Sequence, residues 1–93
     1  MEDKGQIGTV VYSKAGRDKD KLFIVIDVLD EQYVYIADGT LRLIEKPKKK
    51  KIRHLAFTNT KSDEVKNLLI SGEKVSNSMI RKILQSHDVN KEV

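Results

Sequence analysis

The sequence predicts a mainly β fold, in which a small closed sheet of about five strands precedes a short C-terminal α-helical extension. Three observations support this prediction. Short apolar runs rich in Ile, Val and Tyr recur through the first 57 residues, polar turn residues separate them, and the apolar spacing becomes helical after Phe57. We therefore expect a barrel over residues 1–58 and a helical extension over residues 59–93 that packs on it.

The first two strands are predicted on either side of a basic loop. The segment IGTVVY (7–12) is rich in β-branched residues, which favour strands. The segment LFIVIDVL (22–29) is a continuous apolar run, whose length and Ile/Val content favour a strand covered on both faces over a buried helix. Between them, SKAGRDKDK (13–21) has one glycine, two aspartates and four positive charges, so we expect a loop.

A hairpin is predicted after a polar turn at residues 30–32. The segment YVYIA (33–37) has the composition of a third strand. The pair Asp38-Gly39 follows it and predicts a type I′ turn, which needs positive φ at both central positions. We therefore expect TLRLIEK (40–46) to return as the fourth strand.

The next segment combines a proline with a run of lysines. Pro47 cannot donate a ladder hydrogen bond, so it should end the fourth strand or lie at an edge. We expect the lysines at 48–51 to form a displayed loop, held between that strand and a short fifth strand, IRHLAF (52–57). An SH3-like barrel is the economical arrangement of such strands, because small β domains must dispose of their edges.

Two helices are predicted in the extension. Ser62 alone, or Thr60 with Asp63, can cap the first helix, which can stop at Gly72. Ser76 can cap the second. Each helix carries an apolar stripe, formed by Val65, Leu68 and Leu69 in the first and by Met79, Ile80, Ile83 and Leu84 in the second. Both are too short to be stable alone, so they must pack on each other, on the barrel or on a partner.

Composition excludes several classes of protein. The chain has no cysteine, so disulfides and thiolate metal sites are excluded and a reducing compartment fits. Its N-terminal residues are polar, unlike a secretory signal, and no apolar run approaches the roughly 20 residues of a membrane helix. His54 and His87 are expected at packing or surface positions. We expect a cytoplasmic protein with no cofactor and no metal.

Charge is unevenly distributed along the chain, whose net charge is +4. Residues 24–38 contain four acidic side chains and no Lys or Arg. Residues 39–56 contain seven Lys or Arg and a single Glu. A localised field of this kind can attract a polyanion where a uniform mild charge would not.

A strand, a basic loop and a second apolar strand follow one another in GTVVYSKAGRDKDKLFIVIDVLDEQYVYIADG (8–39). This order resembles the KOW motif of ribosomal and transcription-associated RNA-binding proteins, and Gly16 matches the near-fixed glycine of its loop. The continuation LRLIEKPKKKKIRHL (41–55) is similar to bacterial KOW-domain proteins that resemble the archaeal and eukaryotic large-subunit ribosomal protein fourteen-e. One departure is Asp20, where the loop of the motif often carries a second glycine.

The resemblance implies an RNA-binding protein of the translation apparatus with an SH3-like barrel. Its partners would be ribosomal or other structured RNA, recognised by shape and phosphate position, and also ribosomal proteins. Neutralisation of phosphates by Lys and Arg would supply most of the affinity. The candidate RNA-binding residues are Lys14, Gly16, Arg17, Lys19, Lys21, Lys46, Lys48, Lys49, Lys50, Lys51 and Arg53. Arg17 and Arg53 are expected to make the directional contacts, and Gly16 to allow a sharp turn or close approach.

Other interpretations stay open. A lysine run can be a merely solvated loop, and an SH3-like barrel can serve as a protein–protein adaptor. Tyr12, Tyr33 and Tyr35 can stack on bases, although half-buried barrel positions are favoured. The sequence shows no phosphate-binding glycine loop, nucleophile elbow or metal cluster, and no carboxylate pair spaced for acid–base work. We therefore assign no catalytic residue and expect no enzyme.

Overall fold

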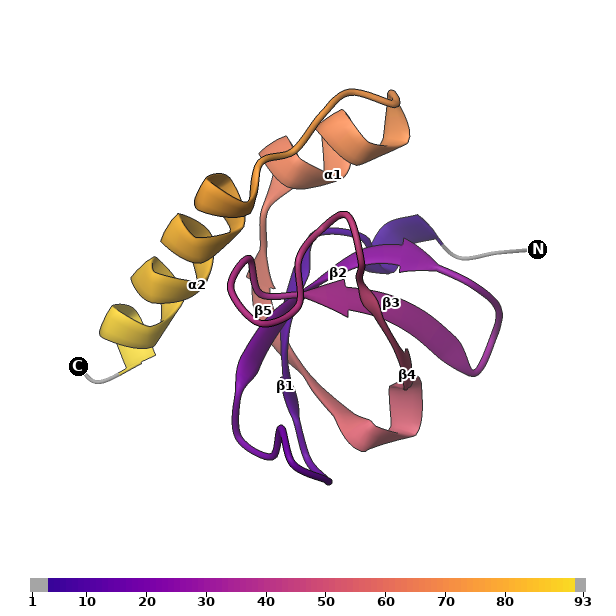
Figure 1. Ribbon diagram of the computed structural model, residues 1–93, viewed down its shortest axis with the longest axis vertical. Coiled ribbons are helices and arrows are strands. Elements are labelled where there is room, and N and C mark those ends of the chain that lie inside the picture. The colour runs from indigo at the N-terminus through magenta and orange to yellow at the C-terminus, as the bar shows by residue number, and fades with distance from the viewer. Residues whose placement is uncertain (1–3, 92–93) are drawn as a thin grey trace.

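The chain forms one antiparallel five-stranded sheet followed by two helices (Figure 1). The computed structural model describes residues 4–91, so residues 1–3 of the polar N-terminal segment and residues 92–93 of the predicted extension lie outside it. The strands are β1 (Thr9–Ser13), β2 (Leu22–Val28), β3 (Tyr33–Ala37), β4 (Lys48–Lys51) and β5 (Leu55–Lys61), in the order β4-β3-β2-β1-β5. The mainly β prediction, with a small barrel and a C-terminal helical extension, is confirmed.

Strand β2 is covered on both faces, as its continuous apolar run predicted. Phe23 and Val25 belong to a core cluster inside the sheet, together with Val34 and Ile36 of β3. Ile24 and Ile26 point to the other face, where a second cluster joins the sheet to the helices. Because successive side chains alternate between faces, a strand between two cores must be apolar at nearly every position.

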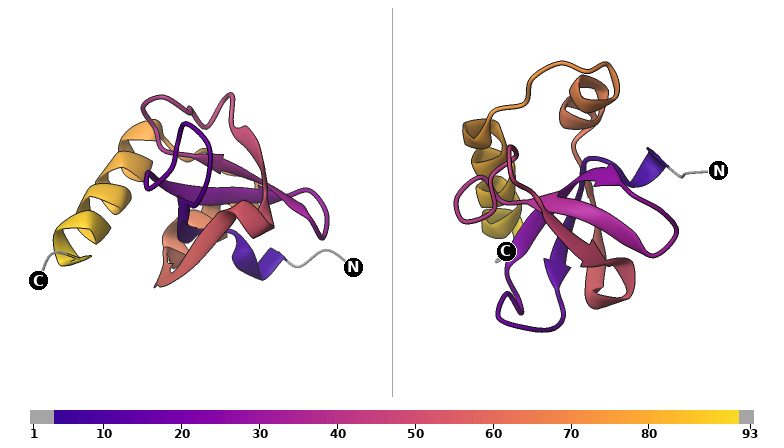
Figure 2. Two further views of the ribbon diagram at one scale, coloured as in Figure 1. Left: turned by 90° about the horizontal axis from the view of Figure 1, so that it is seen from below. Right: turned by 45° about the vertical axis from the view of Figure 1, so that its right-hand side comes forward.

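The helices are part of the folded body. The first, α1 (Asp63–Ile70), and the second, α2 (Asn77–Lys91), both contact β2. Figure 2 shows them on one side of the sheet, at an angle to each other. Their apolar stripes contribute buried side chains to the second cluster, namely Val65, Ile80 and Leu84. These side chains pack in one cluster with Val10, Ile24 and Ile26 of the sheet.

The helix limits follow the local signals. The Ser62 hydroxyl accepts a hydrogen bond from the Val65 backbone N–H at 3.2 Å, so Ser62 is the cap of α1. Gly72, with φ of +78°, donates to the Leu69 carbonyl, and Glu73 donates to the Leu68 carbonyl, which together close the helix. The Ser76 hydroxyl accepts from the Met79 backbone N–H at 3.1 Å, as predicted for the second helix.

The predicted type I′ hairpin at Asp38-Gly39 is wrong. Gly39 has φ of +78°, but Asp38 does not adopt positive φ. The Asp38 carboxylate instead accepts hydrogen bonds from the backbone N–H groups of Thr40 and Arg42, at 2.9 and 2.8 Å, and closes a wider loop. Residues 40–46 form no strand in the structure.

Long-range contacts with α2 explain why these residues stay in a loop. The side-chain oxygen of Asn77 accepts a hydrogen bond from the Ile44 backbone N–H at 2.8 Å, and its amide nitrogen donates to the Glu45 carboxylate. The Arg81 guanidinium donates to the Gly39 carbonyl. Backbone groups that a hairpin ladder would use are thus engaged by the helix.

The fourth strand is the lysine run itself, which corrects the prediction of a displayed loop. Lys48–Lys51 pair with β3 from Ile36 to Tyr33, and β4 is an edge of the sheet. Pro47 immediately precedes it, where its missing N–H costs no ladder hydrogen bond. The fifth strand was also placed too early, because Ile52–His54 form a short 3-10 helix, η2, and β5 runs from Leu55 to Lys61.

A second 3-10 turn, η1 (Lys4–Gln6), precedes β1. Within residues 4–91, none of the helices combines the length and the apolar character needed to cross a bilayer.

Candidate nucleic-acid interface

The loop between β1 and β2 (residues 14–21) carries five of the predicted RNA-binding residues, all exposed: Lys14, Gly16, Arg17, Lys19 and Lys21. Hydrogen bonds within the loop give it a defined shape. The Ser13 hydroxyl donates to the Ala15 carbonyl at 2.8 Å, and the Asp20 backbone N–H donates to the Ser13 carbonyl at 2.7 Å. The cations therefore project from an ordered turn.

Asp20 is the position at which the sequence departs from the predicted resemblance to the KOW motif. Its φ is +70°, and Gly16 has φ of +81°. Asp is one of the few residues besides glycine that tolerate the left-handed region, because its short side chain can make local hydrogen bonds. Asp20 therefore adopts a backbone conformation that glycine would also allow.

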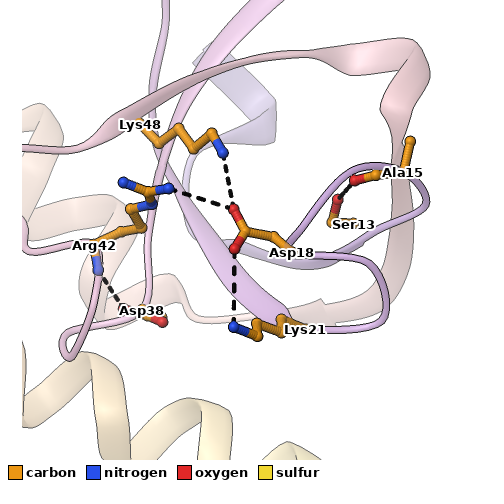
Figure 3. A network of polar contacts seen from close by, with 7 residues as sticks. All are labelled: Ser13, Ala15, Asp18, Lys21, Asp38, Arg42 and Lys48. Atoms are coloured by element: carbon orange, nitrogen blue, oxygen red, sulfur yellow. Dashed lines mark hydrogen bonds and ion pairs between the residues drawn. The ribbon is translucent and has the colours of Figure 1, made fainter.

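Asp18 lies at the centre of an ionic cluster in the same loop (Figure 3). Its side chain is only 10% exposed, and its Oδ2 accepts a hydrogen bond from Lys48 Nζ at 2.9 Å. Arg42 Nη2 lies 3.7 Å from Oδ2, and Lys21 Nζ lies 3.9 Å from Oδ1. The hydrogen bond from Lys48 holds the pKa of Asp18 below its usual value against the opposing effect of burial, and the charges of Lys48, Arg42 and Lys21 add to this.

The four lysines of β4 are divided between the two faces of the sheet. Lys48 and Lys50 pair with Ile36 and Val34, so they share the face that bears the inner core. From there Lys48 reaches Asp18, and a Cβ on Gly16 would lie 3.8 Å from Lys50 Nζ. Two lysines thus extend over the β1–β2 loop.

The other two lysines lie against an aromatic ring. Lys49 Nζ is 4.6 Å and Lys51 Nζ is 5.8 Å from the centre of the Tyr33 ring. Tyr12, Tyr33 and Tyr35 are all half-buried, as the sequence favoured. A pocket of about 430 Å³ is lined by Lys51 and its neighbours Glu31, Gln32, Ile52 and Arg53.

The chain has two basic segments, the β1–β2 loop (residues 14–21) and the stretch of β4 with η2 (residues 48–54). They meet at one end of the barrel. The Lys14 backbone N–H donates to the His54 carbonyl at 2.8 Å, which joins the β1–β2 loop to η2. Figures 1 and 2 show this loop and η2 at the same end of the molecule, away from α1. The structure therefore brings together cations that are more than 30 positions apart in the sequence.

The pKa of His54 is affected by this concentration of positive charge. Burial lowers its pKa, and four nearby cations lower it further: Arg53, Lys50, Lys51 and Lys14. These cations come from both basic segments. Arg53 itself is exposed on η2, and Lys46 is exposed in the loop before Pro47.

Sequence reasoning did not assign three residues of this region to the site. Asp18 and Arg42 were counted only as charges, and His54 was expected at a packing or surface position. An acidic residue inside a basic loop is the signal that could have drawn attention to Asp18. Among residues 4–91, His, Asp and Glu form no group that could hold a metal ion.

The chain was compared with known proteins. No family model matches it, so the resemblance to the KOW motif stays a prediction. The chain is 34% identical over 71 residues to a Bacillus subtilis (strain 168) protein described as "Putative ribosome-binding protein YbzG". The match covers 76% of this chain and 96% of the relative.

Proposed function

The chain belongs to the same family as YbzG, and from this premise we propose that it associates with the ribosome by binding RNA. The relative is described as ribosome-binding, which supports a role in translation. The resemblance of residues 8–39 to the KOW motif points the same way, so we propose ribosomal RNA as the partner and the cytoplasm as the location. The role we propose is binding, without catalysis.

One observation carries the choice of RNA, namely the meeting of the two basic segments at one end of the barrel. The contact between Lys14 and the His54 carbonyl, and the ion pair between Lys48 and Asp18, join segments that both carry excess positive charge. A cationic surface on an ordered scaffold can match the spacing of phosphates better than a flexible tail. Ribosomal RNA is the polyanion that a ribosome offers.

The chemistry of the contact would be phosphate neutralisation. The exposed side chains of Lys14, Arg17 and Lys19 would face the backbone from the loop, and Lys50 and Arg53 would do so from β4 and η2. Arg can hold a phosphate through two parallel hydrogen bonds, whereas Lys acts as a point charge. Such contacts recognise the position of phosphates more than the identity of bases.

The test is equilibrium binding of the full chain to purified Bacillus subtilis ribosomes and to ribosomal RNA stripped of protein, at several salt concentrations. With about five phosphates contacted, the affinity for RNA should fall on the order of 100-fold or more between 50 and 200 mM salt. Binding to ribosomes but not to stripped RNA would favour contact with ribosomal proteins, which is the adaptor alternative. Binding to neither would contradict the proposal.

A second experiment identifies the RNA in cells. Crosslinking followed by sequencing of the bound RNA should enrich large-subunit ribosomal RNA over its background level. Association that survives nuclease treatment would again favour a protein partner.

A further inference from the structure

The Asp18 cluster joins three segments of the chain. Asp18 comes from the β1–β2 loop, Lys48 begins β4, and Arg42 lies in the loop that precedes β4. Figure 3 shows Lys48 and Arg42 at one oxygen of the carboxylate and Lys21 at the other. The sequence separation between Asp18 and Lys48 is 30 residues, so the contact is tertiary.

The exposures of these groups are unequal. The Asp18 side chain is 10% exposed, whereas Lys48, Arg42 and Lys21 are 30%, 41% and 50% exposed. The carboxylate is thus largely withdrawn from solvent and surrounded by cations that remain partly exposed. A buried carboxylate in this situation keeps its partners in place, because losing them would leave an unpaired buried charge.

We propose that Asp18 is a positioning residue of the RNA-binding surface. It fixes the β1–β2 loop against β4 through Lys48 and against the loop before β4 through Arg42. The cations left free to meet phosphates are then the exposed members of the loop and their neighbour on β4: Lys14, Arg17, Lys19 and Lys50. This inference rests on the proposed RNA-binding function and adds which residue organises its surface.

A positioning role for Asp18 and a simple effect of net charge predict opposite changes in RNA affinity when Asp18 is replaced. Removing a negative charge from a basic surface should strengthen the binding of a polyanion if only the net field matters. If Asp18 positions the loop, its removal frees the loop cations to adopt many arrangements, and the affinity falls. The direction of the change therefore separates the two explanations.

The chain offers a matched control two residues away. Asp18→Asn and Asp20→Asn each add one unit of positive charge to the same loop. Asp20 is exposed and makes no ion pair with any described residue. Asn tolerates the left-handed conformation as well as Asp does, so the backbone at position 20 should be unchanged.

The experiment measures binding of the wild-type chain and both variants to stripped Bacillus subtilis ribosomal RNA by fluorescence anisotropy. We expect Asp18→Asn to bind about threefold or more weakly and Asp20→Asn to bind up to about twofold more tightly. Equal or tighter binding by Asp18→Asn, relative to Asp20→Asn, would overturn the inference. Failure of the wild-type chain to bind would instead contradict the proposed function.

A second pair of variants, both on β4, tests the same inference even if Asp18→Asn does not fold. Lys48→Met and Lys49→Met each remove one charge from neighbouring positions on opposite faces. Amide hydrogen exchange in the free chain should become faster at Lys19, Asp20 and Lys21 in Lys48→Met only. Unchanged exchange in this loop would show that Lys48 does not hold it, which would also overturn the inference.

Discussion

The ammonium nitrogen of Lys49 lies 4.6 Å from the centre of the Tyr33 ring. Lys50, the next residue, extends toward Gly16 on the opposite face of the sheet. One run of lysines therefore serves two surfaces, because it is a strand and not a loop. A partner that contacts both surfaces must extend around the edge formed by β4.

Charge reversal on this strand should weaken RNA binding. Lys49→Glu with Lys50→Glu changes one residue on each face and places negative charge beside phosphates, so the affinity for stripped ribosomal RNA should fall on the order of 10- to 100-fold at 0.1 M salt. Lys74→Glu with Lys82→Glu makes the same change in net charge on the helical extension, as a control. Gel-shift titration that finds equal losses for the two double variants would exclude β4 as the contact.

His54 should couple RNA binding to pH. Its pKa in the free chain lies below the usual value of 6.5, because of burial and the surrounding cations. A phosphate at this surface would favour the protonated ring, so the pKa of His54 should rise on binding and affinity should increase as the pH falls from 8 to 5.5. NMR titration of the His54 ring protons, with and without RNA, measures both values.

Two substitutions separate the contribution of His54 to the pH dependence of RNA affinity from that of His87. His54→Gln should reduce the pH dependence of RNA affinity, whereas His87→Gln should retain it.

In the absence of RNA, the lowered pKa of His54 makes the folded chain less stable as the pH falls. The contribution of neutral His54 is present above pH 6.5 and is lost as the pH falls through the lowered pKa.

The ionised carboxylate of Asp18 should stabilise the folded chain at neutral pH and lose this effect in acid. Its folded-state pKa lies below the usual 3.8, so its contribution is present above that pH and is lost as the pH falls through the lowered value. Asp18→Asn should cost about 1–2 kcal/mol at pH 7, because a charged hydrogen bond is lost while its partners stay partly exposed. Urea unfolding between pH 7 and pH 2.5 should show the difference from wild type shrinking below pH 4; a constant difference would contradict an ionic origin.

Two glycines with similar φ should respond very differently to alanine. A Cβ on Gly39 would collide with the Asn77 carbonyl oxygen and lie 3.0 Å from Arg81 Cγ, so Gly39→Ala must shift the loop and α2 relative to each other. A Cβ on Gly16 meets only Lys50 Nζ, at 3.8 Å. Thermal and urea unfolding should give losses of about 2–4 kcal/mol for Gly39→Ala and about 1 kcal/mol for Gly16→Ala. Similar losses would mean that contact with α2 does not restrain the loop.

Much of the fold was predictable because its signals are local. Strands β1 to β3, the caps at Ser62 and Ser76 and the stop at Gly72 depend on residue types within a few positions of each element. The segment from residue 38 to residue 54 was placed wrongly because its partners are distant. Asn77 and Arg81, from the last helix, bind the backbone of the loop that a local rule assigns to a hairpin.

The sequence by itself determined that two basic segments exist, that the second follows a proline, and that β-branched runs and capped helices surround them. Only the tertiary structure decided which way each lysine points and which cations surround Asp18. The physical reason is that strand alternation divides neighbouring side chains between two faces, but the pairing with β3 is what decides which face each one occupies. The ion pair between Lys48 and Asp18 likewise requires that β4 and the β1–β2 loop first be brought together by the sheet.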